Sequence, residues 1–188
     1  MTRLASRCLR GLLLAALVSF AAAAGGCTKV HPLQVSRFNT SPLTDAQADT
    51  ILADATTVLR TNDGPGDVAA DVRMERNGAV TTFTTGDGSI DSQAEFNAVN
   101  GLAGNTKVVN QINWCGVILP NVIGCAPVPG TSLVVVRFAA NQEGILWAHE
   151  FGHNKGLNHR NDANAVMNGT IGVNRRRINQ AECDAYRQ

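Results

Sequence analysis

The sequence predicts a single α+β domain, and three observations support this prediction. Two long stretches repeat apolar residues at helical spacing, whereas several shorter stretches alternate apolar and polar residues or are rich in valine. Hydrophobic residues make up 44% of the chain and charged residues 16%, a balance typical of a globular fold. The length of 188 residues leaves room for one domain of ordinary size once an N-terminal segment is set aside.

Residues 1–26 have the pattern of a signal peptide. Three arginines, Arg3, Arg7 and Arg10, precede an uncharged apolar run over residues 11–24. This run is too short to span a membrane comfortably, because a spanning helix needs about 20 apolar residues. We therefore expect an exported protein.

Two processing routes remain open at the end of this segment. Residues 24–27 resemble a bacterial lipobox, in which Cys27 would be acylated and would tether the chain to a membrane, although Ala24 stands where an aliphatic residue such as Leu is usual. Ordinary cleavage after the Ala-Xaa-Ala sequence that ends at Ala24 is the alternative. Both routes lead to a protein that is secreted or lipid-anchored at the bacterial cell envelope.

Export permits disulfide bonds in the mature chain. Cys115 and Cys125 are the best candidate pair, because they bracket a stretch rich in Gly, Pro and Asn that has little else to hold it. If Cys27 is acylated, Cys183 has no partner, and if it is not, a bond between Cys27 and Cys183 remains open.

The first half of the mature chain predicts one helix and several strands. Residues 27–43 are expected to be a linker with a short edge strand at 33–38, and residues 45–60 have the apolar spacing of a helix. Two alternating stretches follow, and the dipeptide Asn77-Gly78 between them is typical of a hairpin turn. These two strands are expected at 67–75 and 79–84.

The second half predicts three more helices and two more strands. Ser92 and Glu95 form a capping-box pattern that starts a short helix. The valine-rich strand nearest the C-terminus is expected to lie inside a sheet. The predicted elements are a helix at 92–100, strands at 107–112 and 132–138, a helix at 142–155 and a final helix at 178–186.

The stretch from His149 to His159 fits HExxHxxGxxH at every defined position. Histidines four apart lie on the same face of a helix, so His149 and His153 can bind one metal ion. Gly156 can adopt the left-handed conformation that ends a helix and turns the chain sharply. That turn lets His159 return as the third ligand.

Three protein nitrogens leave a fourth position for water, which is typical of a catalytic zinc site. We expect Zn²⁺ as the cofactor and Glu150 as the general base that takes a proton from the zinc-bound water and passes it to the leaving amine. The one histidine between the signal peptide and this motif, His31, is expected to be a surface residue.

The full motif resembles that of the metzincin clan of zinc peptidases, and Ala165-Val166-Met167 is similar to the Met-turn of that clan. Met167 follows His159 by eight residues, a spacing similar to that of the matrixins. The resemblance implies a metzincin-like zincin fold for residues 44–188, with a mixed twisted sheet, an active-site helix and a small C-terminal subdomain.

The sequence also departs from the matrixin pattern. Arg160 stands where matrixins have Ser, and Asn168 and Gly169 follow the Met-turn in place of Tyr. The resemblance therefore does not imply a tyrosine ligand of the kind that astacins have.

We expect a zinc-dependent endopeptidase. The alternatives are a catalytically weak zinc-binding surface lipoprotein with the same fold and a zinc amidase that acts on a non-peptide substrate. A peptide substrate would bind in extended conformation to an edge strand, with residues 115–138 as candidates. The formal charge of +1 argues against a nucleic-acid partner. We expect a monomer, with a membrane tether only if Cys27 is lipidated.

Overall fold

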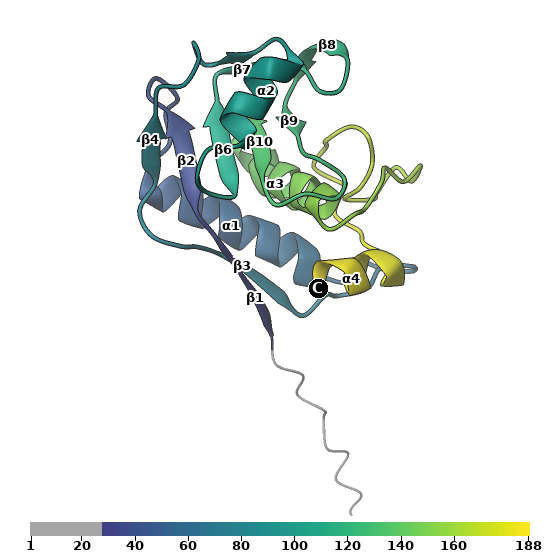
Figure 1. Ribbon diagram of the computed structural model, residues 1–188. Coiled ribbons are helices and arrows are strands. Elements are labelled where there is room, and N and C mark those ends of the chain that lie inside the picture. The colour runs from purple at the N-terminus through teal and green to yellow at the C-terminus, as the bar shows by residue number, and fades with distance from the viewer. Residues whose placement is uncertain (1–27) are drawn as a thin grey trace, which may run out of the picture.

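The computed structural model describes residues 28–188 (Figure 1). The expected signal peptide and the lipidation candidate Cys27 lie outside the described residues. Within the described part, no helix is both long enough and apolar enough to cross a membrane.

A mixed sheet of five strands forms the central layer of the domain (Figure 1). Four strands run parallel, and the edge strand β9 runs antiparallel to its neighbour β10. The order across the sheet is β4 (Thr81–Phe83), β2 (Val35–Phe38), β6 (Thr106–Val109), β10 (Leu133–Val136) and β9 (Gly124–Cys125).

Helices cover both faces of this sheet. Helices α1 (Asp45–Arg60) and α3 (Ala140–Asn154) share one apolar core with it, and the short helix α2 (Gln93–Asn100) shares a second core on the opposite face. Because side chains alternate along a strand, Val135 of β10 joins the first core and Val134 joins the second. This burial on two faces explains why β10 is an uninterrupted apolar run and confirms its predicted interior position.

The N-terminal strands differ from the sequence prediction. Instead of a linker with one edge strand, the chain forms β1 (Lys29–Leu33) and then β2, which lies inside the five-stranded sheet. Strand β1 pairs in parallel with β3 (Val72–Arg76), and β2 pairs in parallel with β4. The β1–β3 pair is thus followed by the β2–β4 pair along the same two segments of the chain.

The hairpin predicted at Asn77-Gly78 is therefore wrong. Lys29 pairs with Val72 and Ser36 pairs with Thr81. The segment from β3 to β4 therefore contains two more residues than the segment from β1 to β2 beside it, while the chain keeps its direction. Gly78 has a φ of 79°, and its left-handed conformation absorbs this irregularity without reversing the chain.

A smaller three-stranded sheet lies beyond the second core. It contains β5 (Ser89–Ile90), β7 (Gln111–Trp114) and β8 (Ile118–Val122), and β7 and β8 form an antiparallel hairpin. The predicted disulfide is present and joins Cys115, in the turn of this hairpin, to Cys125 of β9. The hairpin is thereby tied to the edge of the central sheet.

The chain after α3 forms the lower part of the domain and ends in helix α4 (Gln180–Tyr186) (Figure 1). Tyr186 is fully buried, and its hydroxyl donates to the carbonyl of Ala148 in α3 at 2.9 Å. The prediction that His31 is a surface residue is wrong. Its ring packs 4.9 Å from that of Phe151, and its Nε2 donates to the Tyr186 carbonyl at 2.7 Å. Strand β1 therefore holds the C-terminal helix in place.

A substitution at Gly144 tests the close packing between α1 and α3. A Cβ at this position would lie 2.6 Å from Asp54 Cβ and 2.8 Å from the Ala55 backbone nitrogen, so Gly144→Ala must push the two helices apart. We expect the variant to lose about 1–3 kcal/mol of unfolding free energy, measured by urea denaturation. Asn141→Ala, at an exposed position of the same helix, is the control and should leave stability nearly unchanged. Equal stability of the two variants would contradict this packing.

Candidate active site

Helix α3 positions three of the predicted site residues. His149, Glu150 and His153 are all buried, with His149 and Glu150 each only 4% exposed. Gly152 lies on the same helix, and a Cβ there would come within 2.5 Å of both Met167 Sδ and the Tyr186 hydroxyl. The absence of a side chain at Gly152 lets the helix approach the segment beneath it closely.

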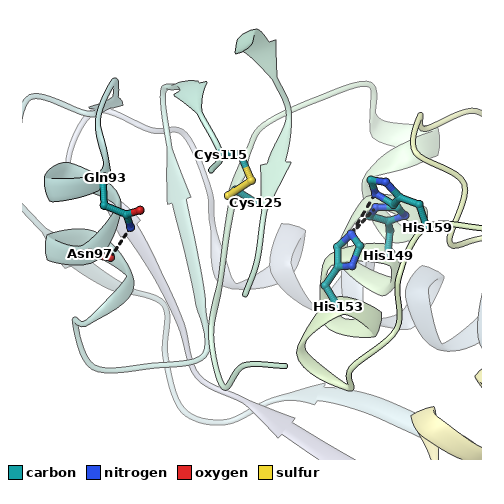
Figure 2. Close-up of a disulfide and its surroundings, with 7 residues drawn as sticks. All are labelled: Gln93, Asn97, Cys115, Cys125, His149, His153 and His159. Carbon is teal, nitrogen blue, oxygen red and sulfur yellow. Dashed lines mark hydrogen bonds between the residues drawn. A yellow bond between two sulfur atoms is a disulfide. The ribbon is translucent and has the colours of Figure 1, made fainter. Parts of the chain in front are cut away.

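The chain turns at Gly156 as the sequence predicts. Gly156 has a φ of 84°, its amide donates to the His153 carbonyl at 2.9 Å, and the Leu157 amide donates to the Gly152 carbonyl at 3.0 Å. This pair of hydrogen bonds is a Schellman motif, which ends the helix and reverses the chain. The reversal brings His159 back toward the helix (Figure 2).

The structure brings the three predicted metal ligands together. His153 Nε2 lies 3.1 Å from His149 Nε2 and 3.2 Å from His159 Nε2 (Figure 2). One ligand nitrogen from each ring falls within 4.8 Å of the other two. His159 is the most exposed of the three, because it comes from the loop rather than from the helix.

Backbone carbonyls fix the orientation of two of these rings. His149 Nδ1 lies 2.7 Å from the Val166 carbonyl oxygen, and His153 Nδ1 lies 2.7 Å from the Leu157 carbonyl oxygen. A carbonyl oxygen can only accept, so each Nδ1 carries the proton and each neutral ring has its lone pair on Nε2. Burial also lowers the pKa of both histidines, that of His149 to about 4, which favours the neutral rings.

This arrangement fits a metal ion. Nε2 lone pairs that face one another at 3.1 Å repel unless a cation lies between them. Two nitrogens bound to a tetrahedral zinc ion at about 2.0–2.1 Å would be about 3.3 Å apart, close to the spacing here. Imidazole nitrogens are also ligands that suit zinc. His149, His153 and His159 are therefore the residues that would hold the zinc ion.

The segment around Met167 supports the site from below. Val166 supplies the carbonyl that orients His149, and Met167 is fully buried with its sulfur 3.4 Å from the Tyr186 hydroxyl. The Tyr186 hydroxyl donates to the backbone of α3 and contacts this methionine, so Tyr186 joins the C-terminal helix to the ligand-bearing helix. The sequence offered no signal for this role of Tyr186.

Arg160 fastens the loop that carries His159. Its guanidinium lies 3.0 Å from a Glu182 carboxylate oxygen in α4 and 2.9 Å from Asp162, and its backbone amide donates to the Met167 carbonyl at 2.7 Å. The residue that departs from the matrixin pattern thus links the third ligand to the segment around Met167 and to α4.

Glu150 lies beside the three histidines and against the edge strand β9. A Cβ on Gly124 would overlap the Glu150 carboxylate, so this glycine makes room for it. Within residues 28–188 the carboxylate has no hydrogen-bond partner, and burial raises its pKa to about 8. Gly124 is a further site residue that sequence reasoning missed, because nothing in the local sequence distinguishes it from a loop glycine.

A cleft of about 730 Å³ contains these groups. One wall comes from β8, β9 and the residues that follow them, and the other comes from the loop at 169–171. The walls are largely apolar. They include Leu119, Pro120, Val122, Ile123, Phe138 and Ile171.

Comparisons with known proteins agree with this geometry. The family model for matrixins, a peptidase family, matches residues 50–187. An archaemetzincin structure from Methanopyrus kandleri is similar, with a TM-score of 0.55 and 16% identity over 82% of this chain and 93% of that one. A zinc-dependent peptidase from Methanocorpusculum labreanum gives a TM-score of 0.51 and 15% identity over 82% of this chain and 100% of that one. These two likenesses show the fold. No curated protein sequence matches the chain.

The buried carboxyl of Glu150 predicts a pH-dependent stability of the metal-free chain. Its folded pKa of about 8 lies above the unfolded value of about 4.3, so the folded chain holds the proton more tightly. The stability that this proton provides is present at low pH and is lost as the pH rises toward 8. Glu150→Gln removes this dependence, so the variant should gain stability over the original chain by up to a few kcal/mol between pH 5 and pH 8.

Urea denaturation in the presence of a chelator at pH 5, 6.5 and 8 measures this difference. A difference in unfolding free energy that does not change with pH would contradict the burial of an uncompensated carboxyl at this position.

Proposed function

We propose that the chain, which belongs to the matrixin family and is therefore a zinc metallopeptidase, is an endopeptidase that cleaves protein substrates bound in extended conformation. The observation that supports this proposal is the convergence of the three histidine Nε2 atoms beside Glu150 in one cleft. His149, His153 and His159 would hold a zinc ion there, and the ion would supply the acidity of a bound water and the polarisation of a peptide carbonyl.

Glu150 acts as the general base in this proposal. Its carboxylate faces the cleft between α3 and β9 and has no other charged group to neutralise it in the described chain, where only burial shifts its pKa. A base with a pKa near the working pH can both accept a proton and return it. Glu150 would therefore take the proton from the attacking water and deliver it to the amine of the departing peptide.

The edge strand β9 offers a place for the substrate backbone. Strand β9 pairs with β10 on one side only, and its residues line the cleft. An extended peptide can add to such an edge through backbone hydrogen bonds. Because the edge binds backbone on either side of the cleavage point, this mode suits internal bonds more than terminal ones.

We also propose that the mature monomer works outside the cytoplasm, secreted or held at the cell envelope through Cys27. The Cys115–Cys125 disulfide supports an oxidising compartment, where such bonds persist. The residues that would decide between secretion and lipidation lie outside the described part of the chain.

Two other functions stay in competition. A zinc-binding surface protein without useful activity would have no chemical need of Glu150, whose burial without a partner is costly. A zinc amidase on a non-peptide substrate would use the same site. The apolar walls and the free sheet edge favour a peptide.

Glu150→Gln should abolish cleavage while zinc stays bound. Removing a positioned general base costs about 10²–10⁴-fold in rate, so digestion of casein should fall at least a hundredfold. The control Glu75→Gln removes an exposed carboxylate remote from the cleft and should cleave normally. A chelator should stop cleavage by the original chain, and added zinc should restore it.

Cleavage that survives Glu150→Gln or the chelator would refute this mechanism. If the original chain binds zinc and casein but cleaves nothing, the binding protein is the better account. Cleavage of non-peptide amides alone would favour the amidase.

A further inference from the structure

The tip of the β7–β8 hairpin carries the most exposed apolar side chains of the described chain. Val117, Ile118 and Leu119 are consecutive, and they are 58%, 78% and 48% exposed. No residue from Val108 to Val136 is charged, so this apolar tip lies in a neutral segment of the sequence. Soluble proteins rarely leave such contiguous apolar surface uncovered unless it binds something.

Three contacts connect the tip to the rest of the domain. Its strands pair as an antiparallel hairpin, and Trp114 at its base packs 5.6 Å from Phe96 of α2. The Cys115–Cys125 disulfide joins the start of the tip to β9 (Figure 2). Gly116, with a φ of 76°, makes the turn that presents the three apolar residues. The hairpin is therefore tied to the edge strand beside the candidate active site.

The tip continues into the cleft wall. Leu119 is exposed at the tip and also lines the cleft, as does Pro120 after it. Phe138 is 40% exposed and lines the same cleft. An apolar surface thus runs from the outside of the hairpin to the neighbourhood of Glu150.

We propose that the hairpin tip, Gly116–Pro120, is a docking surface for an apolar segment of an unfolded protein substrate, beyond the residues next to the cleaved bond. This inference rests on the proposed peptidase function. The tip lengthens the contact that an extended chain makes after it leaves the cleft. The substrates that it favours are polypeptides with exposed apolar stretches rather than charged or sugar-bearing ones.

The charge pattern favours a polypeptide over a membrane. Loops that bind lipid surfaces combine apolar residues with Lys or Arg, which are attracted to anionic lipids, and with Trp or Tyr at the interface. The tip has none of these residues, and the nearest cations along the chain are Lys107 and Arg137. The tip alone is also too small to hold a second copy of the chain, because a stable interface involves about 20–30 residues on each partner.

The test compares a double variant, Val117→Ser with Ile118→Ser, with the control Val173→Ser. Val173 is 46% exposed but lies outside both the tip and the cleft lining. All these side chains are exposed, so thermal unfolding should be unchanged. In the zinc-loaded Glu150→Gln background, the Kd for labelled casein should rise about 10-fold with the double variant and less than about twofold with the control.

The second measurement uses the catalytically active chain, which retains Glu150. The double variant should raise KM for casein, and the ratio of kcat/KM for casein to kcat/KM for a short quenched peptide that fits the cleft should fall about 10-fold. An unchanged casein Kd would overturn the docking surface. So would an equal loss with casein and the short peptide, which would place the tip within the cleft itself.

The third measurement is binding to phosphatidylcholine vesicles. If the original chain binds these vesicles and the double variant does not, the tip is a lipid-binding surface and the proposal is wrong. If neither casein nor peptide is cleaved, the proposed function fails, yet casein binding in the Glu150→Gln background still decides whether the tip docks an unfolded polypeptide.

Discussion

Two backbone carbonyls determine the chemistry of this domain. The carbonyls of Val166 and Leu157 each accept a hydrogen bond from a protonated Nδ1 atom, which leaves the Nε2 lone pairs of His149 and His153 directed at one point. The third ring, from His159, arrives at the same point through the turn at Gly156. Neutral nitrogens held this close repel one another, so the fold provides a place that only a cation can stabilise.

The rest of the domain holds these carbonyls and rings in position. Gly152 lets Met167 and Tyr186 approach the ligand helix, and Gly124 leaves room for the Glu150 carboxylate. Arg160 connects the loop below the site to α4, and the buried Tyr186 connects α4 to α3. The C-terminal helix therefore contributes to the site although none of its residues is a ligand. The edge of the sheet and its disulfide-tied hairpin then provide the apolar surface along which a substrate could lie.

Local patterns predicted the helices and the clustering of the three histidines well, because helical spacing, caps and the HExxHxxGxxH motif depend on residues close in sequence. The predicted helix at 45–60 and the capping of α2 by Ser92 are both present. Contacts between distant segments were harder to predict. The parallel pairing of β1 with β3 replaced the expected hairpin, and His31 proved to be buried against α4. The role of Gly124 depends on where β9 meets α3, which no local pattern encodes.

The zinc content of the purified chain tests the central claim most directly. After dialysis against metal-free buffer, elemental mass spectrometry should find one zinc ion for each chain and almost none in His153→Ala, whose ring is the common neighbour of the other two. An original chain that retains no transition metal, or a variant that retains a full equivalent, would contradict the account.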